Sequence, residues 1–272
     1  MFDEAGLAFP EGPRWRDGTW WVSDQLGGRV LRVGEDASVE AFASIDAPSG
    51  LGFAPDGTLL VARMNEPSIV GVDGADVVER ADLRALARHL NDMFVDSQGR
   101  AYVDAYDDPF DVTTHKLLRV DRSGEVHVAA DGLAFPNGVT ATADGATLLV
   151  SETFAGRITA FDVAPDGALG DRRTWASLPE GRLPDGLCLD ASGDVWVAAY
   201  TTGEFFHLRE GGEVLDRLEF AGRWAMSCSL GGADGRTLLL CTAETTQEDY
   251  FAGRSVGHLD RHRVEVPGVG LP

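Results

Sequence analysis

Short apolar runs, each introduced by a polar-Gly turn, recur along the whole chain. The six copies are RDGTWWVSD, PDGTLLVAR, SQGRAYVDAY, ADGATLLVSET, ASGDVWVAAY and ADGRTLLLCTAE, beginning at Arg16, Pro55, Ser97, Ala143, Ala191 and Ala233. β-Branched and aromatic residues are frequent in these runs, which favours strands over helices. The turn glycines are Gly18, Gly57, Gly99, Gly145, Gly193 and Gly235, so the successive spacings are 39, 42, 46, 48 and 42 residues.

Similarity at this period, built from strands and tight turns, is typical of a β-propeller. Six such units fill the 272 residues without a Ser/Pro/Gly-rich linker or a low-complexity tract. We therefore predict an all-β protein in which residues 1–272 form a single six-bladed β-propeller domain. The tail from Val256 alternates apolar and polar residues, and a ring must hide its first and last edges. We expect this C-terminal strand to pair with the N-terminal blade and so close the ring.

One segment departs from the strand pattern. Between Val77 and Leu90 the apolar residues fall at helical spacing, at Leu83, Leu86 and Ala87 and at Leu90 itself. A short helix or a helical turn is expected there, leading into the third unit.

The charge balance limits the partners. The chain has 44 acidic and 23 basic residues, a net charge of −21, which would repel the phosphates of a nucleic acid. The N-terminal sequence has neither the basic start nor the apolar core of a signal peptide, and no stretch has the 18 or so apolar residues of a membrane span. We expect a cytoplasmic protein that binds neither nucleic acid nor membrane. The sequence leaves the oligomeric state open.

A second pattern shares the register of the turns. Three stretches, FPEGPRW, FPNGVTA and LPDGLCL, place a residue with a side-chain oxygen between proline and glycine. Counting eight residues back from each turn glycine, or seven in the first unit, gives Glu11, Ser49, Asn91, Asn137, Asp185 and Ser227. Equivalent positions of a propeller surround its central axis, so we predict that these six residues, hereafter the ring residues, face one mouth of the channel.

The ring residues have the donor chemistry of a metal site. Two carboxylates and two amides, with no His or Cys among them, are hard oxygen donors that suit Ca²⁺. We expect one divalent metal ion, Ca²⁺ in the first place, with Zn²⁺, Mn²⁺ or Mg²⁺ as alternatives. The alternative for each ring residue is that its side chain caps its own turn.

At these residues the sequence resembles a known family. EGPRW, NDMFVDSQGRAYV, FPNGVTATADGATLLVSET, PDGLCLDASGDVWVA and CSLGGADGRTL are similar to motifs of the senescence marker protein/gluconolactonase family, regucalcin-like proteins that include lactonases. The resemblance implies a six-bladed propeller with a divalent metal at the channel mouth. It implies Glu11, Asn137 and Asp185 as ligands, Asn91 beside the metal or substrate, and Asp185 also as the general base.

One position departs from the family pattern. Sugar-lactonase members carry an Arg two residues before the Asn of the third unit, where this chain has His89. A substrate other than a sugar lactone is therefore an open alternative. The further candidates for substrate contact are Tyr106 and Asp107, in the segment YDDPFD, and Trp224, which closely precedes the sixth ring position.

These features favour a divalent-metal-dependent hydrolase that opens a small-molecule lactone or related ester. A bound cation polarises a carbonyl oxygen, and a nearby carboxylate accepts a proton from water. Two alternatives stay open: a non-catalytic, metal-stabilised propeller that binds a ligand or a protein, and a metal-dependent enzyme acting on a non-lactone substrate. A serine hydrolase is not indicated, because no His lies in register beside Ser49 or Ser227.

Overall fold

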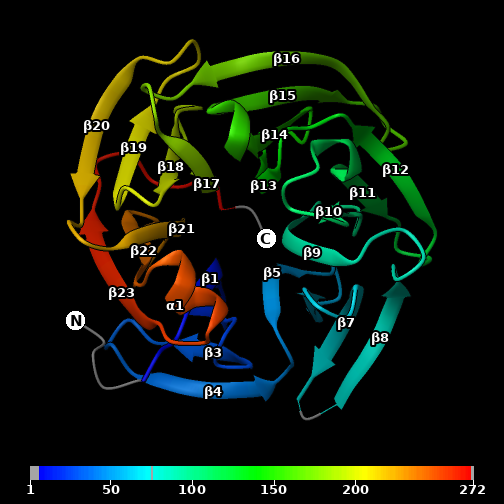
Figure 1. The fold of residues 1–272 in the computed structure, drawn as a ribbon, viewed down its shortest axis with the longest axis horizontal. Coiled ribbons are helices and arrows are strands. Elements are labelled where there is room, and N and C mark those ends of the chain that lie inside the picture. The colour runs from blue at the N-terminus through cyan, green and yellow to red at the C-terminus, as the bar shows by residue number, and fades with distance from the viewer. Residues whose placement is uncertain (1–5, 75, 271–272) are drawn as a thin grey trace.

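The protein is a six-bladed β-propeller, as predicted. The computed structural model describes residues 6–74 and 76–270. Within them, five four-stranded sheets and one three-stranded sheet surround a common axis, each starting with its innermost strand and ending at the rim (Figure 1). None of the helices in this part of the chain has the length and apolar character that crossing a membrane requires.

The first three blades follow one another along the chain. The first contains β1 (Pro10–Arg16), β2 (Thr19–Asp24), β3 (Arg29–Val33) and β4 (Val39–Ser44). The second contains β5 (Pro48–Phe53), β6 (Leu59–Arg63), β7 (Ser68–Asp73) and β8 (Asp76–Asp82). The third contains β9 (His89–Val95), β10 (Ala101–Tyr106), the 3-10 helix η1 (Val112–Thr114), β11 (Lys116–Val120) and β12 (Val126–Asp131).

The last three blades complete the ring. The fourth contains β13 (Pro136–Ala141), β14 (Thr147–Glu152), the 3-10 helix η2 (Thr153–Ala155), β15 (Arg157–Val163) and β16 (Leu169–Ser177). The fifth contains β17 (Leu183–Leu189), β18 (Val195–Tyr200), β19 (Glu204–Leu208) and β20 (Val214–Glu219). The sixth contains β21 (Trp224–Gly231), β22 (Thr237–Glu244) and β23 (Val256–Arg263), with helix α1 (Gln247–Phe251) between β22 and β23.

The six turn glycines connect the first and second strands of the blades, as expected. Each has a positive φ, between 68° at Gly145 and 89° at Gly57, a conformation that glycine adopts without steric cost. These turns define the far end of the channel. The opposite end, where the innermost strands begin, is called the mouth below.

The predicted closure of the ring was wrong. β23 pairs along its whole length with β22 of its own blade, and the first blade has four strands without it. The N-terminal segment instead reaches the last blade, where the Gly257 N–H donates a hydrogen bond of 2.8 Å to the Leu7 carbonyl. Leu7 and Trp20 also pack against Leu259 there. Pairing with the adjacent β22 requires closing only a short loop, which costs less entropy than pairing across the ring.

The segment from Val77 to Leu90 contains a helical turn but no helix. Its first part belongs to the rim strand β8. The Leu83 carbonyl then accepts hydrogen bonds from the N–H groups of Leu86 and Ala87, which closes one turn before β9. Leu83, Ala87 and Leu90 are buried and pack in one cluster. The helical spacing therefore reflected a single packed turn.

The C-terminal segment covers the far end of the channel. The Pro267 carbonyl accepts a hydrogen bond from the Ala191 N–H, and the Gly268 N–H donates to the carbonyl of the turn glycine Gly235. Residues 268–270 then line a cavity of about 50 Å³ together with residues of the inner strands, Leu187 and Cys228 among them. We therefore expect small molecules to approach from the mouth.

The glycine that follows Asn137 and Asp185 has a packing role. A Cβ on Gly138 would lie 2.5 Å from the Asp185 carbonyl oxygen and 2.7 Å from the Gly186 Cα, and one on Gly186 would lie 2.2 Å from the Ser227 Oγ. The innermost strands of neighbouring blades thus approach too closely for a side chain. The glycine of the Pro-x-Gly motif permits this approach, and the middle residue supplies the ring oxygen.

Gly138→Ala should therefore destabilise the protein by about 1 to 3 kcal/mol, because backbone atoms of β17 would have to move. Denaturant unfolding measures the change. Gly170→Ala is the matched control, since a Cβ there meets nothing within 4 Å. Equal stability of the two variants would contradict this account of the motif.

Candidate active site

The six ring residues lie on the six innermost strands near the mouth, as predicted. In every blade the pairing of the innermost strand with its neighbour is irregular at this level, as between Pro136 and Val139 in β13 and between Pro184 and Leu187 in β17. Asn137 and Asp185 fall inside these interruptions. Such irregularities re-aim side chains and are frequent beside active sites.

One half of the ring is joined by hydrogen bonds. The Ser49 Oγ donates to the Asn91 Oδ1 at 2.9 Å, and the Asn91 Nδ2 donates to the Asn137 Oδ1 at 3.0 Å. Three side chains from the second, third and fourth blades are thereby held together. Asn91 thereby orients the Asn137 Oδ1. This oxygen keeps a second lone pair for another partner.

The other half of the ring contains the two carboxylates. Glu11 is 9% exposed and Asp185 is 4% exposed. Burial, followed by the charge of Asp92, raises the pKa of Glu11 to about 8. Burial, followed by the charge of Glu11, raises the pKa of Asp185 well above its ordinary value. The Asp185 Oδ1 is buried and has no hydrogen-bond partner among the described residues.

Three charged residues that the sequence reasoning missed lie beside this pair. The Arg14 Nη2 is 3.2 Å from the Asp92 Oδ1, and the Asp104 Oδ2 accepts a hydrogen bond of 2.8 Å from the Asp92 N–H. Burial, then the charge of Asp92, raises the pKa of Asp104 well above its ordinary value. The signal for Arg14 and Asp92 was their place directly beside ring motifs, in EGPR and ND.

The predicted substrate contacts all lie at the mouth. Tyr106 ends β10 opposite His89, and the two rings stack with centroids 5.2 Å apart. Trp224 begins β21. The Asp107 Oδ1 accepts a hydrogen bond of 3.0 Å from the Arg88 N–H, so this carboxylate also braces the loop beside His89. Their roles toward a substrate stay predictions.

Further aromatic residues at the mouth were missed. Phe135, two residues before Asn137, packs on Tyr106, and Tyr200 packs on Trp224. Tyr250 lies on α1, in the connection between β22 and β23. Its hydroxyl donates a hydrogen bond of 2.7 Å to the Gln25 Oε1. Burial, then the charges of Glu11 and Asp185, raises the pKa of Tyr250, so its hydroxyl lies near the two ring carboxylates. The repeat gave no sign of Tyr250 because α1 lies outside it.

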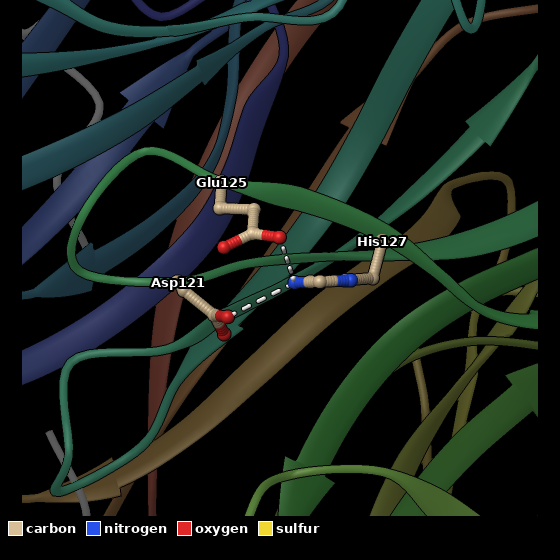
Figure 2. Close-up of side chains that lie close together, drawn as sticks. All are labelled: Asp121, Glu125 and His127. Carbon is tan, nitrogen blue, oxygen red and sulfur yellow. Dashed lines mark hydrogen bonds and ion pairs between the residues drawn. The ribbon is translucent and has the colours of Figure 1, made fainter.

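Two other groups of acidic residues and histidine are structural. Figure 2 shows Asp121 and Glu125, in the turn between β11 and β12, and His127 on β12, where the His127 Nε2 is 3.1 Å from the Asp121 Oδ2. Both oxygens of Asp121 accept hydrogen bonds from Arg119, a cation already in place.

The second group lies at the β17–β18 turn. The buried Asp190 accepts a hydrogen bond from the Asp194 N–H through one oxygen, and its other oxygen lies 2.9 Å from the His207 Nε2. Both of its oxygens therefore have protein partners. The carboxylates Asp121 and Asp190 of the two groups already bind protein partners, and we assign no metal to either group.

A comparison with protein families identifies the family of this chain. Residues 9–244 match the sequence model of the SMP-30/Gluconolactonase/LRE-like region. The chain belongs to this family. The match covers all six innermost strands and ends with β22, so α1 and its Tyr250 lie outside it. The predicted family is thereby confirmed.

Individual relatives are similar at modest identity. Pentonolactonase XacC from Haloferax volcanii is 27% identical over 96% of this chain and 92% of its own, and regucalcin from Xenopus laevis is 26% identical over 88% and 85%. Among solved structures, the gluconolactonase XC5397 from Xanthomonas campestris has a TM-score of 0.74 at 26% identity, covering 94% of this chain and 87% of its own. A calcium-binding regucalcin from Agrobacterium tumefaciens has a TM-score of 0.84 at 19% identity, over 100% and 95%, and supports the fold alone.

Proposed function

We propose that this protein is a divalent-metal-dependent hydrolase that opens the ring of a lactone or a related ester at the channel mouth. The observation that carries the proposal is the pair of buried carboxylates, Glu11 and Asp185, at the same level of the propeller as the oriented amide of Asn137. The two lactonases among the relatives support this reaction class.

The residues present fit a hard divalent cation. Glu11, Asn137 and Asp185 offer two carboxylates and one amide oxygen. This donor set suits Ca²⁺ and Mg²⁺ better than Zn²⁺. The charge of Glu11, after burial, raises the pKa of Asp185, so ionising both carboxylates is unfavourable unless a positive charge compensates them. The Asp185 Oδ1, which has no hydrogen-bond partner among the described residues, also supports a cation at this position. Ca²⁺ is our first choice.

The reaction consumes one water. The oxygen of the water bonds to the lactone carbonyl carbon, the ring C–O bond breaks, and the product is a hydroxy acid that releases a proton at neutral pH. A bound divalent cation would polarise the carbonyl oxygen of the substrate. We assign to Asp185 the acceptance of the proton from the attacking water and to Glu11 a role as ligand only.

The remaining residues position this pair. Asn91 fixes Asn137 through its amide, and Ser49 fixes Asn91. Arg14 balances part of the negative charge behind the ring through Asp92. His89 is neutral at pH 7, because burial lowers its pKa from an ordinary value already below 7. It therefore offers a substrate a ring face and a hydrogen bond but no charge.

A screen by proton release tests the proposal. Protein treated with a chelator is assayed with sugar, aliphatic and aromatic lactones while Ca²⁺, Zn²⁺, Mn²⁺ or Mg²⁺ is added. We expect ring opening that depends on the added ion, with Ca²⁺ effective. If folded protein binds the ion and opens none of these lactones, the proposal fails in favour of a non-catalytic, metal-stabilised propeller.

A further inference from the structure

The aromatic walls of the mouth lead to an inference about the substrate, which rests on the proposed function. We infer that the preferred substrate is a lactone that carries an aromatic ring, and that side chains at the mouth select it by ring contacts. The selecting residues form two groups: the first wall is His89, Tyr106 and Phe135, and the second wall is Tyr200, Trp224 and Tyr250.

In the first wall, His89 and Phe135 each lie two residues before a ring residue, Asn91 and Asn137. Tyr106 stacks on His89 with an interplanar angle of 28°, and its ring centroid is 5.2 Å from that of Phe135. Phe135 has a φ of 60°, which a non-glycine residue adopts only at a cost of about 1 kcal/mol or more. Its N–H donates to the His115 Nδ1 at 3.0 Å, and its carbonyl accepts from the Thr153 N–H. These bonds hold the Phe135 ring at the mouth despite the strain.

In the second wall, Trp224 begins β21 three residues before Ser227, and Tyr200 pairs with Leu183, two residues before Asp185. Tyr200 and Trp224 meet edge to face with centroids 4.7 Å apart, and the Tyr250 centroid is 6.3 Å from that of Trp224. The bond from the Tyr250 hydroxyl to Gln25 fixes this ring relative to the first blade. Tyr250 stands on α1, outside the repeated blade, so its ring is an addition to a wall that β18 and β21 begin.

Both walls lie at the mouth, where β9 and β21 begin, and both keep part of their surface exposed. His89, Phe135, Tyr200 and Tyr250 are only half-buried. A ligand at Asp185 would meet these exposed ring surfaces.

Ring surfaces discriminate between the lactone classes. An aromatic substituent gains about 0.5 to 1.5 kcal/mol from each well-placed ring contact. The hydroxyl groups of a sugar lactone would lose water against the same surfaces, at about 1 to 3 kcal/mol for each group left without a partner. The first term favours aromatic lactones and the second disfavours sugar lactones.

The test measures both turnover and binding in the Ca²⁺-loaded protein. Dihydrocoumarin, δ-valerolactone and D-glucono-δ-lactone are compared by kcat/KM, each divided by its rate of opening by hydroxide. Binding of the lactam analogue of dihydrocoumarin, which is not opened, is measured by calorimetry. Tyr250→Ala and His89→Ala remove one ring from each wall, Tyr250→Phe keeps the ring without its hydroxyl, and His127→Ala on the outer strand β12 is the histidine control.

We expect the corrected kcat/KM to be highest for dihydrocoumarin by about 10-fold or more. Tyr250→Ala and His89→Ala should each weaken binding of the lactam by about 3- to 10-fold and lower kcat/KM more for dihydrocoumarin than for δ-valerolactone. His127→Ala should bind the lactam within about 2-fold of the parent. Tyr250→Phe should weaken binding less than Tyr250→Ala, because it keeps the ring.

Two results overturn the inference and leave the proposed function standing. One is a preference for D-glucono-δ-lactone. The other is an equal loss of kcat/KM for dihydrocoumarin and δ-valerolactone in Tyr250→Ala and His89→Ala. If no lactone is opened, the proposed function fails separately, and binding of the lactam still tests the walls. Thermal unfolding of each variant identifies any loss that comes from misfolding.

Discussion

Replacing Asp185 by Asn should lower lactone turnover by about 10²- to 10⁴-fold at saturating metal. The substitution keeps the volume and one ligand oxygen but removes the carboxylate that we assign as the proton acceptor. Affinity for the ion should fall as well, because Glu11 would be the remaining ring carboxylate. Turnover is therefore measured by proton release across a titration of Ca²⁺, so that occupancy and chemistry are separated.

Asp73→Asn provides the matched control, since Asp73 is an exposed residue at the end of β7 on the outside of the second blade. It should keep the parental turnover and Ca²⁺ affinity. A metal-saturated Asp185→Asn protein that turns over at the parental rate would remove Asp185 from the mechanism. The base would then have to come from another blade, with Asp107 as the next candidate.

Calcium should stabilise the protein strongly at pH 8 and only weakly at pH 5. The folded, metal-free protein holds a proton on Glu11 up to about pH 8, whereas the unfolded chain releases it near its ordinary pKa of 4.5. The folded state thus binds more protons between these values, and the stability of the metal-free protein falls as the pH rises through this window. Asp185, whose pKa is also raised, contributes in the same direction.

A cation reverses this effect because it binds the ionised carboxylates. At 100 times its dissociation constant a ligand stabilises by about 2.7 kcal/mol, which raises the Tm of a protein of this size by about 5 to 10 °C. We expect such an increase at pH 8 and less than about 2 °C at pH 5, measured by thermal unfolding with chelator or Ca²⁺. In Glu11→Gln, most of the difference between the Ca²⁺-induced Tm increases at pH 8 and pH 5 should disappear. An equal increase at both pH values would place the ion elsewhere.

The height of the ring residues along the propeller axis was predictable from the sequence, because each blade of a propeller repeats the same geometry. Each turn glycine fixes the end of an innermost strand, so an offset of seven or eight residues finds Glu11 and Asp185 at the same height, although they are 174 positions apart. The helical spacing around Leu83 was misleading, because a single buried turn produces the same spacing as the start of a helix.

The charged residues behind the ring were harder to predict. Arg14, Asp92 and Asp104 come from two blades, and their contact depends on how closely β1 and β9 approach the axis. Asp104 lies on β10, the second strand of its blade. On such a strand, the alternation of apolar and polar residues does not distinguish a side chain directed to the channel from one packed between blades. The bulged pairing of β9 with β10 decides this, and no sequence pattern marked it.

By itself, the sequence determined the class of fold, the number of blades, the family and the height of the six ring residues, because all of these depend on a regular strand period and on glycine turns. Only the tertiary structure decided that β23 joins β22, that Asn91 orients Asn137, and that Tyr250 stands over the ring. These features depend on contacts between blades. Such contacts join residues far apart in the chain, and their energy comes from burial and close packing that no local pattern records.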